Sequence, residues 1–335
     1  MPNVEAYLSS QKEKIKSAKV VDEFQKLEEY YVKKLWYELT EELLKLVQDE
    51  EFTKNVDLLD LYQNFLSEFE HRISPISLMH IILPIQQTIT DVPAAVQFLD
   101  QLRTVVKGSD EAMTLLLSAI AAAWLRQRDA EGKCVERQTV RDIIEEAKTK
   151  LDALPGVTTA HGNFYKVSSS YYREIGDFAS YFKEALRFLG CTDLAELKDS
   201  DKQHYAMCLS LAALLGEDVY NFGELLAHPI LECLKTESNA WLVDLLFAFN
   251  RGDLAKFEQL RPKWTTQPDL VQNELQLGRK IRLLCLMEMA YLSPSNNKQL
   301  TFKDIATKAN VPQSDVEHLV MRALSLNLVK GYIDQ

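Results

Sequence analysis

The chain has 335 residues, of which 47% are hydrophobic and 26% are charged, and its formal net charge is −11. A chain of this length and apolar content can bury a large core, divided among two or three folding units. Its negative charge argues against a general affinity for nucleic acid or anionic membranes, because binding to phosphates needs clustered cations. Proteins are therefore the expected partners.

Helix is the secondary structure that the composition favours, because Gly and Pro number only 11 and 10. Apolar residues recur at helical spacing from Phe24 to Leu46, which predicts amphipathic helices there. The apolar run Met113–Leu125 is too short to span a bilayer, which needs about 20 residues, and is predicted to be a buried helix. Further helical blocks are expected near 57–70, 75–88, 93–106, 110–128 and 136–151.

A loose repeat begins near residue 160 and is marked by three turns, Gly176-Asp177, Gly216-Glu217-Asp218 and Gly252-Asp253. At each turn the glycine is expected to end one helix in the left-handed region, and the Asp to cap the next. The apolar stripes between the turns are interpreted as core between stacked helix pairs, with a cofactor-binding surface as the alternative. These stripes contain Phe164, Val167, Tyr171, Ile175, Tyr181, Ala185, Phe188, Leu189, Tyr205, Cys208, Leu211, Leu215, Trp241, Leu242, Leu245 and Phe249.

The C-terminal block has a different pattern. One long helix is predicted over 269–292, followed by a linker at 293–297. Two short strands are predicted at 299–302 and 328–333, with two helices between them. Capping boxes, Thr301 with Asp304 and Ser314 with Glu317, are expected to open these helices. The order strand, helix, turn, helix, strand is that of a winged helix.

The sequence contains no motif that predicts catalysis: no G-x-G-x-x-G, P-loop, G-x-S-x-G or H-E-x-x-H is present. The six histidines are never spaced at i, i+3 or i+4, and the five cysteines never form C-x-x-C. We therefore expect no enzymatic activity, no metal and no cofactor. The cysteines are predicted to be reduced core thiols, and the first residues lack the pattern of a signal peptide, which favours a cytoplasmic and nuclear location.

DNA binding by the helix-turn-helix is the main alternative, but its second helix offers only Arg322 against Asp315 and Glu317. A nucleic-acid reader would carry a basic footprint, which residues 298–335 lack. A module with apolar strands suits edge pairing with a neighbouring protein instead.

Four segments carry a resemblance to a known family: 228–231, 241–254, 280–284 and 300–306. Together they resemble a PCI domain, the helical-repeat and winged-helix module of the proteasome lid, the COP9 signalosome and translation initiation factor three. From about residue 4 to its last residue the chain is most similar to subunits of the proteasome regulatory-particle lid.

The resemblance implies an all-α fold, a right-handed solenoid of helix pairs that resemble tetratricopeptide repeats, followed by a winged helix with a small β element. Expected boundaries are 1–158 for the N-terminal repeats, 159–297 for the helical part of the PCI domain and 298–335 for the winged helix. Family members continue into a second wing strand and a C-terminal helix, whereas this sequence stops at Gln335. The wing is therefore predicted to be incomplete.

The implied function is that of a non-catalytic scaffold subunit, which supports assembly of the machine that degrades ubiquitinated proteins. Its expected partners are other PCI subunits in a hetero-oligomer, with no nucleic acid and no membrane. The alternatives are a scaffold subunit of the COP9 signalosome or initiation factor three, or a nucleic-acid-binding PCI protein. An alternative role for Val329 and Ile333 is to cover the module's own core. The predicted interface residues are Leu300, Phe302, Val329, Lys330, Tyr332 and Ile333.

Overall fold

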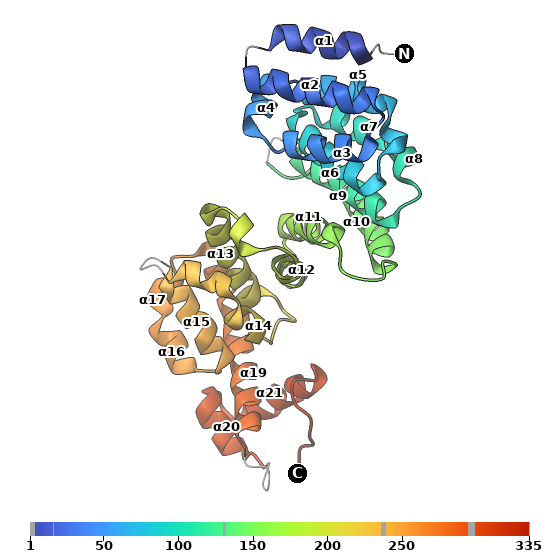
Figure 1. Cartoon of the computed structure of the whole chain (residues 1–335). Coiled ribbons are helices and arrows are strands. Elements are labelled where there is room, and N and C mark those ends of the chain that lie inside the picture. Colours follow the sequence, from blue (N-terminus) through green and yellow to red (C-terminus); the bar gives the residue numbers. More distant parts are fainter. Residues whose placement is uncertain (1–3, 16, 130–131, 236–238, 294–298, 335) are drawn as a thin grey trace. The chain divides into compact units, whose positions relative to one another are not determined.

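The computed structural model describes residues 4–15, 17–129, 132–235, 239–293 and 299–334, and these residues form helices joined by short turns (Figure 1). No strand occurs in the described part of the chain, where an isolated antiparallel bridge joins Arg128 to Cys134. The all-α prediction is therefore confirmed. The chain divides into two compact units, Met1–Glu174 and Ile175–Gln335. The boundaries expected at 158 and 297 remain predictions.

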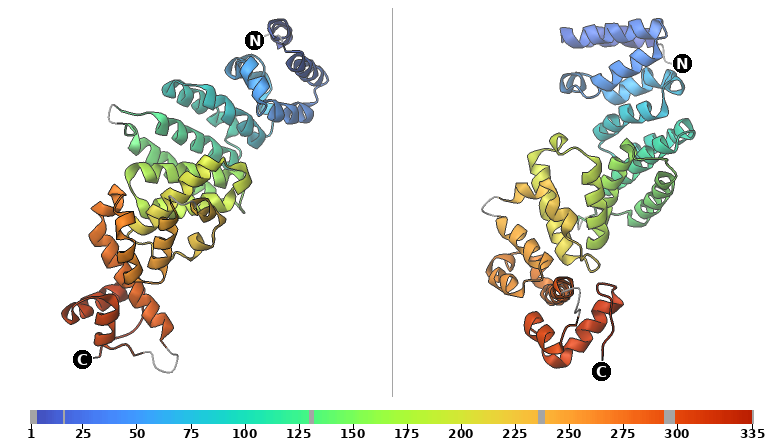
Figure 2. Two further views of the ribbon diagram at one scale, coloured as in Figure 1. Left: turned by 90° about the vertical axis from the view of Figure 1, so that its left-hand side faces the viewer. Right: turned by 60° about the horizontal axis from the view of Figure 1, so that its bottom comes forward.

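The first unit is a stack of helices in which neighbours along the chain pack in pairs, such as α1 with α2 and α9 with α10 (Figure 2). Two 3₁₀ turns, η1 (Leu66–Glu68) and η2 (Glu70–Arg72), join α5 to α6. The helices are α1 (Val4–Lys14), α2 (Ala18–Val32), α3 (Trp36–Leu46), α4 (Glu50–Asn55), α5 (Leu58–Asn64), α6 (Pro75–Thr88), α7 (Val92–Gln101), α8 (Arg103–Val106), α9 (Asp110–Arg126), α10 (Arg137–Asp152) and α11 (Thr159–Ile175), which ends at the boundary.

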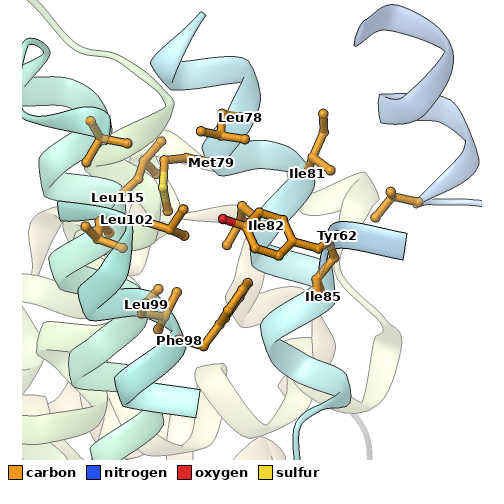
Figure 3. Close-up of a cluster of buried hydrophobic side chains, with 14 of the residues drawn as sticks. Tyr62, Leu78, Met79, Ile81, Ile82, Ile85, Phe98, Leu99, Leu102 and Leu115 are labelled. Carbon is orange, nitrogen blue, oxygen red and sulfur yellow. The ribbon is translucent and has the colours of Figure 1, made fainter. Parts of the chain in front are cut away.

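Helix α9 is the central helix of this unit, because α6, α7, α8 and α10 all pack on it. Its apolar side chains are buried together with those of α5, α6 and α7, where the Tyr62 and Phe98 rings meet edge to face at 4.9 Å (Figure 3). The two polar residues of the run do not disturb this packing. Thr114 and Ser118 are buried but donate their hydroxyls to carbonyls one turn earlier. The predicted buried helix is confirmed.

The second unit is organised around its longest helix, α19 (Glu274–Leu292), which packs against α13, α15, α16, α18, α20 and α21. The other elements are α12 (Phe178–Cys191), η3 (Leu194–Glu196), α13 (Asp199–Leu215), α14 (Gly223–Ala227), η4 (Pro229–Leu234), α15 (Ala240–Asn250), α16 (Leu254–Gln259), α17 (Arg261–Trp264), α18 (Pro268–Gln272), α20 (Phe302–Ala309) and α21 (Gln313–Ser325).

Two of the three predicted glycine turns are confirmed. Gly176 and Gly252 have φ angles of +79° and +59°, the left-handed conformation that glycine adopts without strain. The carboxylates of Asp177 and Asp253 each accept a hydrogen bond of 3.0 Å from the backbone N–H three residues on. These aspartates therefore cap α12 and α16.

The third turn differs from the prediction. Gly216 has a φ of −64°, outside the left-handed region, and Asp218 caps no helix because α14 begins only at Gly223. The reason is a tertiary contact: the Gly216 carbonyl accepts a hydrogen bond of 2.7 Å from the Lys280 ammonium, which replaces a glycine cap at the end of α13.

The apolar stripe predicted on α13 is also turned relative to the core. Of Tyr205, Cys208, Leu211 and Leu215, only Leu215 is buried. The residues that α13 buries are Ala206, Leu209, Ser210, Ala212, Ala213, Leu214 and Leu215. Small residues let α13 approach its neighbours closely on that face, so the predicted stripe lies at the edge of the core.

The five cysteines are free thiols, as expected, but they do not all lie in the core. Cys134 and Cys285 are buried, whereas Cys191 is exposed and Cys208 and Cys233 are half-buried. The core-thiol prediction is therefore right for two of them and wrong for Cys191.

The single long helix predicted over 269–292 is interrupted at Asn273, which separates α18 from α19. The Asn273 side-chain amide donates to the Asp269 carbonyl at 2.9 Å and competes with a continuous helical ladder there. Most of the predicted linker, 294–297, lies outside the described residues.

Candidate docking module

Helices α20 and α21 form the predicted helix-turn-helix beside α19 (Figure 1). The N-cap of the first capping box is confirmed, because the Thr301 hydroxyl oxygen accepts a hydrogen bond of 3.2 Å from the Asp304 backbone N–H. The Asp304 carboxylate accepts from the Thr301 hydroxyl at 2.6 Å. Asn310 ends α20 in the left-handed conformation, with a φ of +48°. Asn tolerates this conformation better than most residues, so the turn is encoded locally.

The second capping box is absent. Helix α21 begins at Gln313 after Pro312, so Ser314 lies inside the first turn rather than at its start. Its hydroxyl donates to the Asp315 carboxylate at 3.1 Å and caps no backbone N–H. Pro312 causes the shift, because its fixed φ suits the position before a helix and starts the helix earlier than the Ser–Glu spacing suggests.

The two strands predicted to flank this pair are not present in residues 299–334. Phe302 is the first residue of α20. The segment after α21 forms the C-terminal cap of α21. Asn327 is left-handed, and Leu328 donates its backbone N–H to the Ala323 carbonyl at 3.0 Å. This pattern is a Schellman cap. An isolated strand has no partner for its backbone groups, and the two predicted segments do not pair.

A small apolar core holds α19, α20 and α21 together. The Cys285 thiol donates to the Lys308 carbonyl at 3.6 Å and ties α19 to α20, and burial raises the pKa of this thiol. The module is thus packed as one piece with the longest helix of its unit. The buried residues are Leu283, Cys285, Leu286, Met289, Ile305, Ala309, Val316 and Ala323.

Three of the six predicted interface residues contribute to this core. Leu300, Phe302 and Val329 are half-buried, and each packs against the cluster. For Val329 this is the alternative role considered above, covering the module's own core. Much of the surface of these side chains is therefore already used within the chain.

The other three lie in the segment after α21. Lys330 is exposed, Ile333 is half-buried, and Tyr332 is 92% exposed. Tyr332 is the most exposed large hydrophobic residue in the described part of the chain. A partner could reach its whole ring.

Sequence reasoning missed three exposed apolar residues of the same module. Tyr291 and Leu292 end α19 with exposures of 83% and 62%, and Met321 on α21 is 43% exposed. Tyr291 and Leu292 directly precede the predicted linker. An apolar pair at the end of a helix, next to a linker, could have indicated an exposed apolar surface.

A buried lysine joins α13 to α19, the helix against which α20 and α21 pack. Lys280 of α19 is 6% exposed, and its ammonium donates to the carbonyls of Ala213, Leu214 and Gly216 at 2.6, 3.1 and 2.7 Å. Carbonyls at a helix C-terminus lack partners within the helix and carry partial negative charge. Lys280 therefore satisfies the end of α13 and binds that helix to α19.

The surroundings of this ammonium are mostly apolar and aromatic. Its nitrogen lies 5.7 Å from the Tyr220 ring centre and 5.5 Å from that of Phe222. Burial lowers the pKa of Lys280 to about 7, against which the Asp218 charge acts. A cavity of about 160 Å³ adjoins it and is also lined by Tyr220 and by Arg322 of α21. The lysine site thus extends to α21.

Within the described residues, no group of three or more His, Cys, Asp and Glu side chains could hold a metal ion. In the same residues, no helix has both the length and the apolar character needed to cross a membrane.

Comparison with known families agrees with this architecture. The PCI domain description matches residues 254–335, and a family described as PSD13 N-terminal repeats matches residues 23–246. The fold and its C-terminal module therefore define a helical-repeat protein with a PCI domain. More specifically, the chain belongs to the family of 26S proteasome non-ATPase regulatory subunit 13.

Two proteasome relatives are similar over nearly the whole chain, and an initiation-factor subunit is similar over about half of it. "26S proteasome non-ATPase regulatory subunit 13 homolog B" of Arabidopsis thaliana is 34% identical over 98% of this chain and 86% of that protein. "26S proteasome regulatory subunit RPN9" of Saccharomyces cerevisiae is 34% identical over 93% of this chain and 81% of that protein. "Eukaryotic translation initiation factor 3 subunit M" of Aspergillus clavatus is 27% identical over 48% of this chain and 34% of that protein.

Proposed function

We propose that the chain is a non-catalytic scaffold subunit of the proteasome regulatory-particle lid, in a hetero-oligomer with other PCI subunits. In this role it supports assembly of the ATP-dependent machine that degrades ubiquitinated proteins, in the cytoplasm and the nucleus. The carrying observation is the 34% identity over 98% of the chain to a relative named as a proteasome regulatory subunit. The likeness to initiation factor 3 subunit M covers only 48% of the chain and is a weaker basis for function.

A structural role also fits the buried lysine of α19. The Lys280 ammonium gives its hydrogen bonds to three main-chain carbonyls, so it serves to hold two helices together. We propose no catalytic activity for the chain. We also propose no binding to nucleic acid, because the net charge is −11 and α21 carries acidic as well as basic residues.

Docking is proposed through the exposed part of the C-terminal module. Tyr332 and Lys330 supply an aromatic ring and a cation that the module's own core does not cover, and Tyr291 and Leu292 add apolar surface. Tyrosine is enriched among the residues that dominate binding at interfaces. Ile333 is proposed to join this surface, and Leu300, Phe302 and Val329 to support it through their half-buried side chains.

The test is to compare a tagged wild-type chain with a Tyr332→Asp, Lys330→Glu double variant and to quantify the proteasome chains that co-purify. We expect recovery of these chains to fall at least about tenfold, since loss of an interface hot spot costs about 2 kcal/mol or more. Val329→Asp is unsuitable because Val329 packs on the core and the change would unfold the module.

The matched control is Tyr37→Asp, which makes the same substitution at another exposed tyrosine. Tyr37 lies in the other unit and is 75% exposed. It should leave recovery unchanged. Circular dichroism and a thermal melt establish that both variants are folded. A folded double variant that recovers proteasome chains at the wild-type level would refute the docking surface.

A further inference from the structure

The half-buried face of α13 carries a thiol beside an imidazole. Cys208 and His204 are four residues apart on this helix and therefore lie on the same face. The Cys208 sulfur is 3.6 Å from His204 Nε2 and 4.0 Å from Nδ1. His204 is exposed and Cys208 is half-buried, so solvent reaches the pair.

Cys191 provides a natural comparison in the same unit. It ends α12, which packs against α13, and it is the exposed cysteine of the chain. No imidazole contacts its sulfur among the described residues, and partial burial raises the pKa of its thiol. Exposure alone would make Cys191 the more reactive cysteine. A neighbouring base would favour Cys208, because the thiolate is the nucleophile and an imidazole promotes its formation.

We propose that Cys208 is a thiol-modification site that exchanges with low-molecular-weight disulfides such as glutathione disulfide, with His204 as the base. His204 takes the proton of the Cys208 thiol, and the thiolate attacks one sulfur of the disulfide. A new bond forms between Cys208 and that sulfur, and the original disulfide bond breaks. The second sulfur leaves as a thiolate and takes the proton from the imidazolium.

The reaction needs no further oxidant, because the small disulfide is reduced as Cys208 is oxidised. The product is a mixed disulfide on α13, which an excess of small thiol reverses. The attached group occupies the solvent side of the face that carries His204. It lies outside the residues proposed for docking, so the modification is independent of the proposed function.

The experiment uses the full chain in the presence of a metal chelator at pH 7.4. The protein is incubated with glutathione disulfide, quenched at intervals with an alkylating reagent and digested. Mass spectrometry then gives the rate of glutathione addition at each cysteine. We expect Cys208 to react about fivefold faster than Cys191, because a base lies beside the Cys208 sulfur.

Two variants separate the imidazole from general effects. His204→Gln should lower the rate at Cys208 to that of Cys191 or below, whereas His318→Gln, at an exposed histidine on α21, should leave both rates unchanged. The proposal is overturned if Cys191 reacts faster in the wild type, or if a folded His204→Gln variant keeps the wild-type rate at Cys208. If His204→Gln does not fold, the ratio of the two rates in the wild type decides alone.

Discussion

Among the residues that the structure describes, Lys280 is the one charged residue that is buried. Its ammonium donates hydrogen bonds to backbone carbonyls rather than to a carboxylate. Its pKa falls to about 7 from an ordinary 10.5 because burial disfavours the charged form. Between these two values the unfolded chain binds the proton more tightly than the folded chain. The lysine therefore lowers stability near neutral pH, and this loss is relieved as the pH rises from about 7 toward 10.5.

The first prediction concerns Lys280→Met. The free energy of unfolding of the wild type, minus that of the variant, should rise with pH between about 7 and 10.5. The limiting slope is about 1.4 kcal/mol for each pH unit. Urea unfolding of both proteins at a series of pH values measures this difference. Parallel stability curves for the two proteins would contradict the lowered pKa.

The variant should also be less stable at the alkaline end of the range. It removes this donor from the carbonyls of Ala213, Leu214 and Gly216, of which Gly216 still accepts from the Val219 backbone N–H at 3.4 Å. Each unsatisfied buried carbonyl costs about 1–3 kcal/mol. Lys280→Arg, the control that keeps a cation, should be destabilised as well, because the planar guanidinium does not reproduce the ammonium's three directions.

Periodicity could not predict this lysine site. Along 269–292 the helical period predicts one apolar face, and four of its five residues are buried whereas Met287 is half-buried. The other four are Leu270, Leu277, Ile281 and Leu284. A lysine next to that face is ordinarily solvated. Its burial follows from the end of α13, more than 60 residues earlier in the chain, which the sequence pattern does not place.

At the scale of elements, the two left-handed glycine turns offer a matched pair. A Cβ at Gly252 would lie 2.3 Å from Cys285 Cα and 2.5 Å from Cys285 N, whereas a Cβ at Gly176 would meet nothing within 4 Å. Both substitutions impose a left-handed conformation on alanine. Only at Gly252 does the added carbon also collide with the backbone of α19.

The second prediction follows from this pair. Gly176→Ala should lower the free energy of unfolding by about 1 kcal/mol, the cost of the conformation alone. Gly252→Ala should lower it by about 3 kcal/mol or more, because α15 and α16 must move away from α19. Chemical unfolding monitored by circular dichroism compares the two. Equal losses would show that the close approach at Gly252 is not tight.

The third prediction compares Thr301, which caps α20, with Ser314, which was predicted to cap the following helix but does not. Thr301→Ala should destabilise the module by about 1 kcal/mol, because it removes the hydroxyl that accepts from the Asp304 backbone. Ser314→Ala should change stability by less than about 0.5 kcal/mol, because Ser314 caps no backbone group. Hydrogen exchange at the first amides of α20 and α21 measures both effects. Faster exchange in α21 on Ser314→Ala would contradict this assignment.

These pairs show which element-level features a sequence can predict. Gly-Asp turns and the Thr301 cap depend on neighbours within four residues, so local chemistry determines them. The strands at 299–302 and 328–333 required a partner strand, and apolar content cannot show whether one is present. Asn327 and Leu328 end α21 instead, and a Schellman cap and a strand start share the same kind of residues.

At the scale of the whole molecule, family membership came from long collinear similarity rather than from any one motif. Local physics predicted the helical class. Only the exposure of the proposed interface residues can be compared with the prediction, and it agrees in part: Tyr332 exposes its ring, whereas Val329 packs inward. The exposure of a side chain depends on tertiary packing. The alternation of side chains along the predicted strand 328–333 could not predict that packing.

The proposed role as a scaffold within the proteasome regulatory particle is tested by affinity purification of the tagged chain from cells, at low and at moderately raised salt, followed by mass spectrometry. We expect proteasome regulatory-particle chains to co-purify in stoichiometric amounts at both salt concentrations. Recovery of initiation-factor or signalosome chains in their place, or of mainly nucleic acid that is lost steeply with salt, would contradict it.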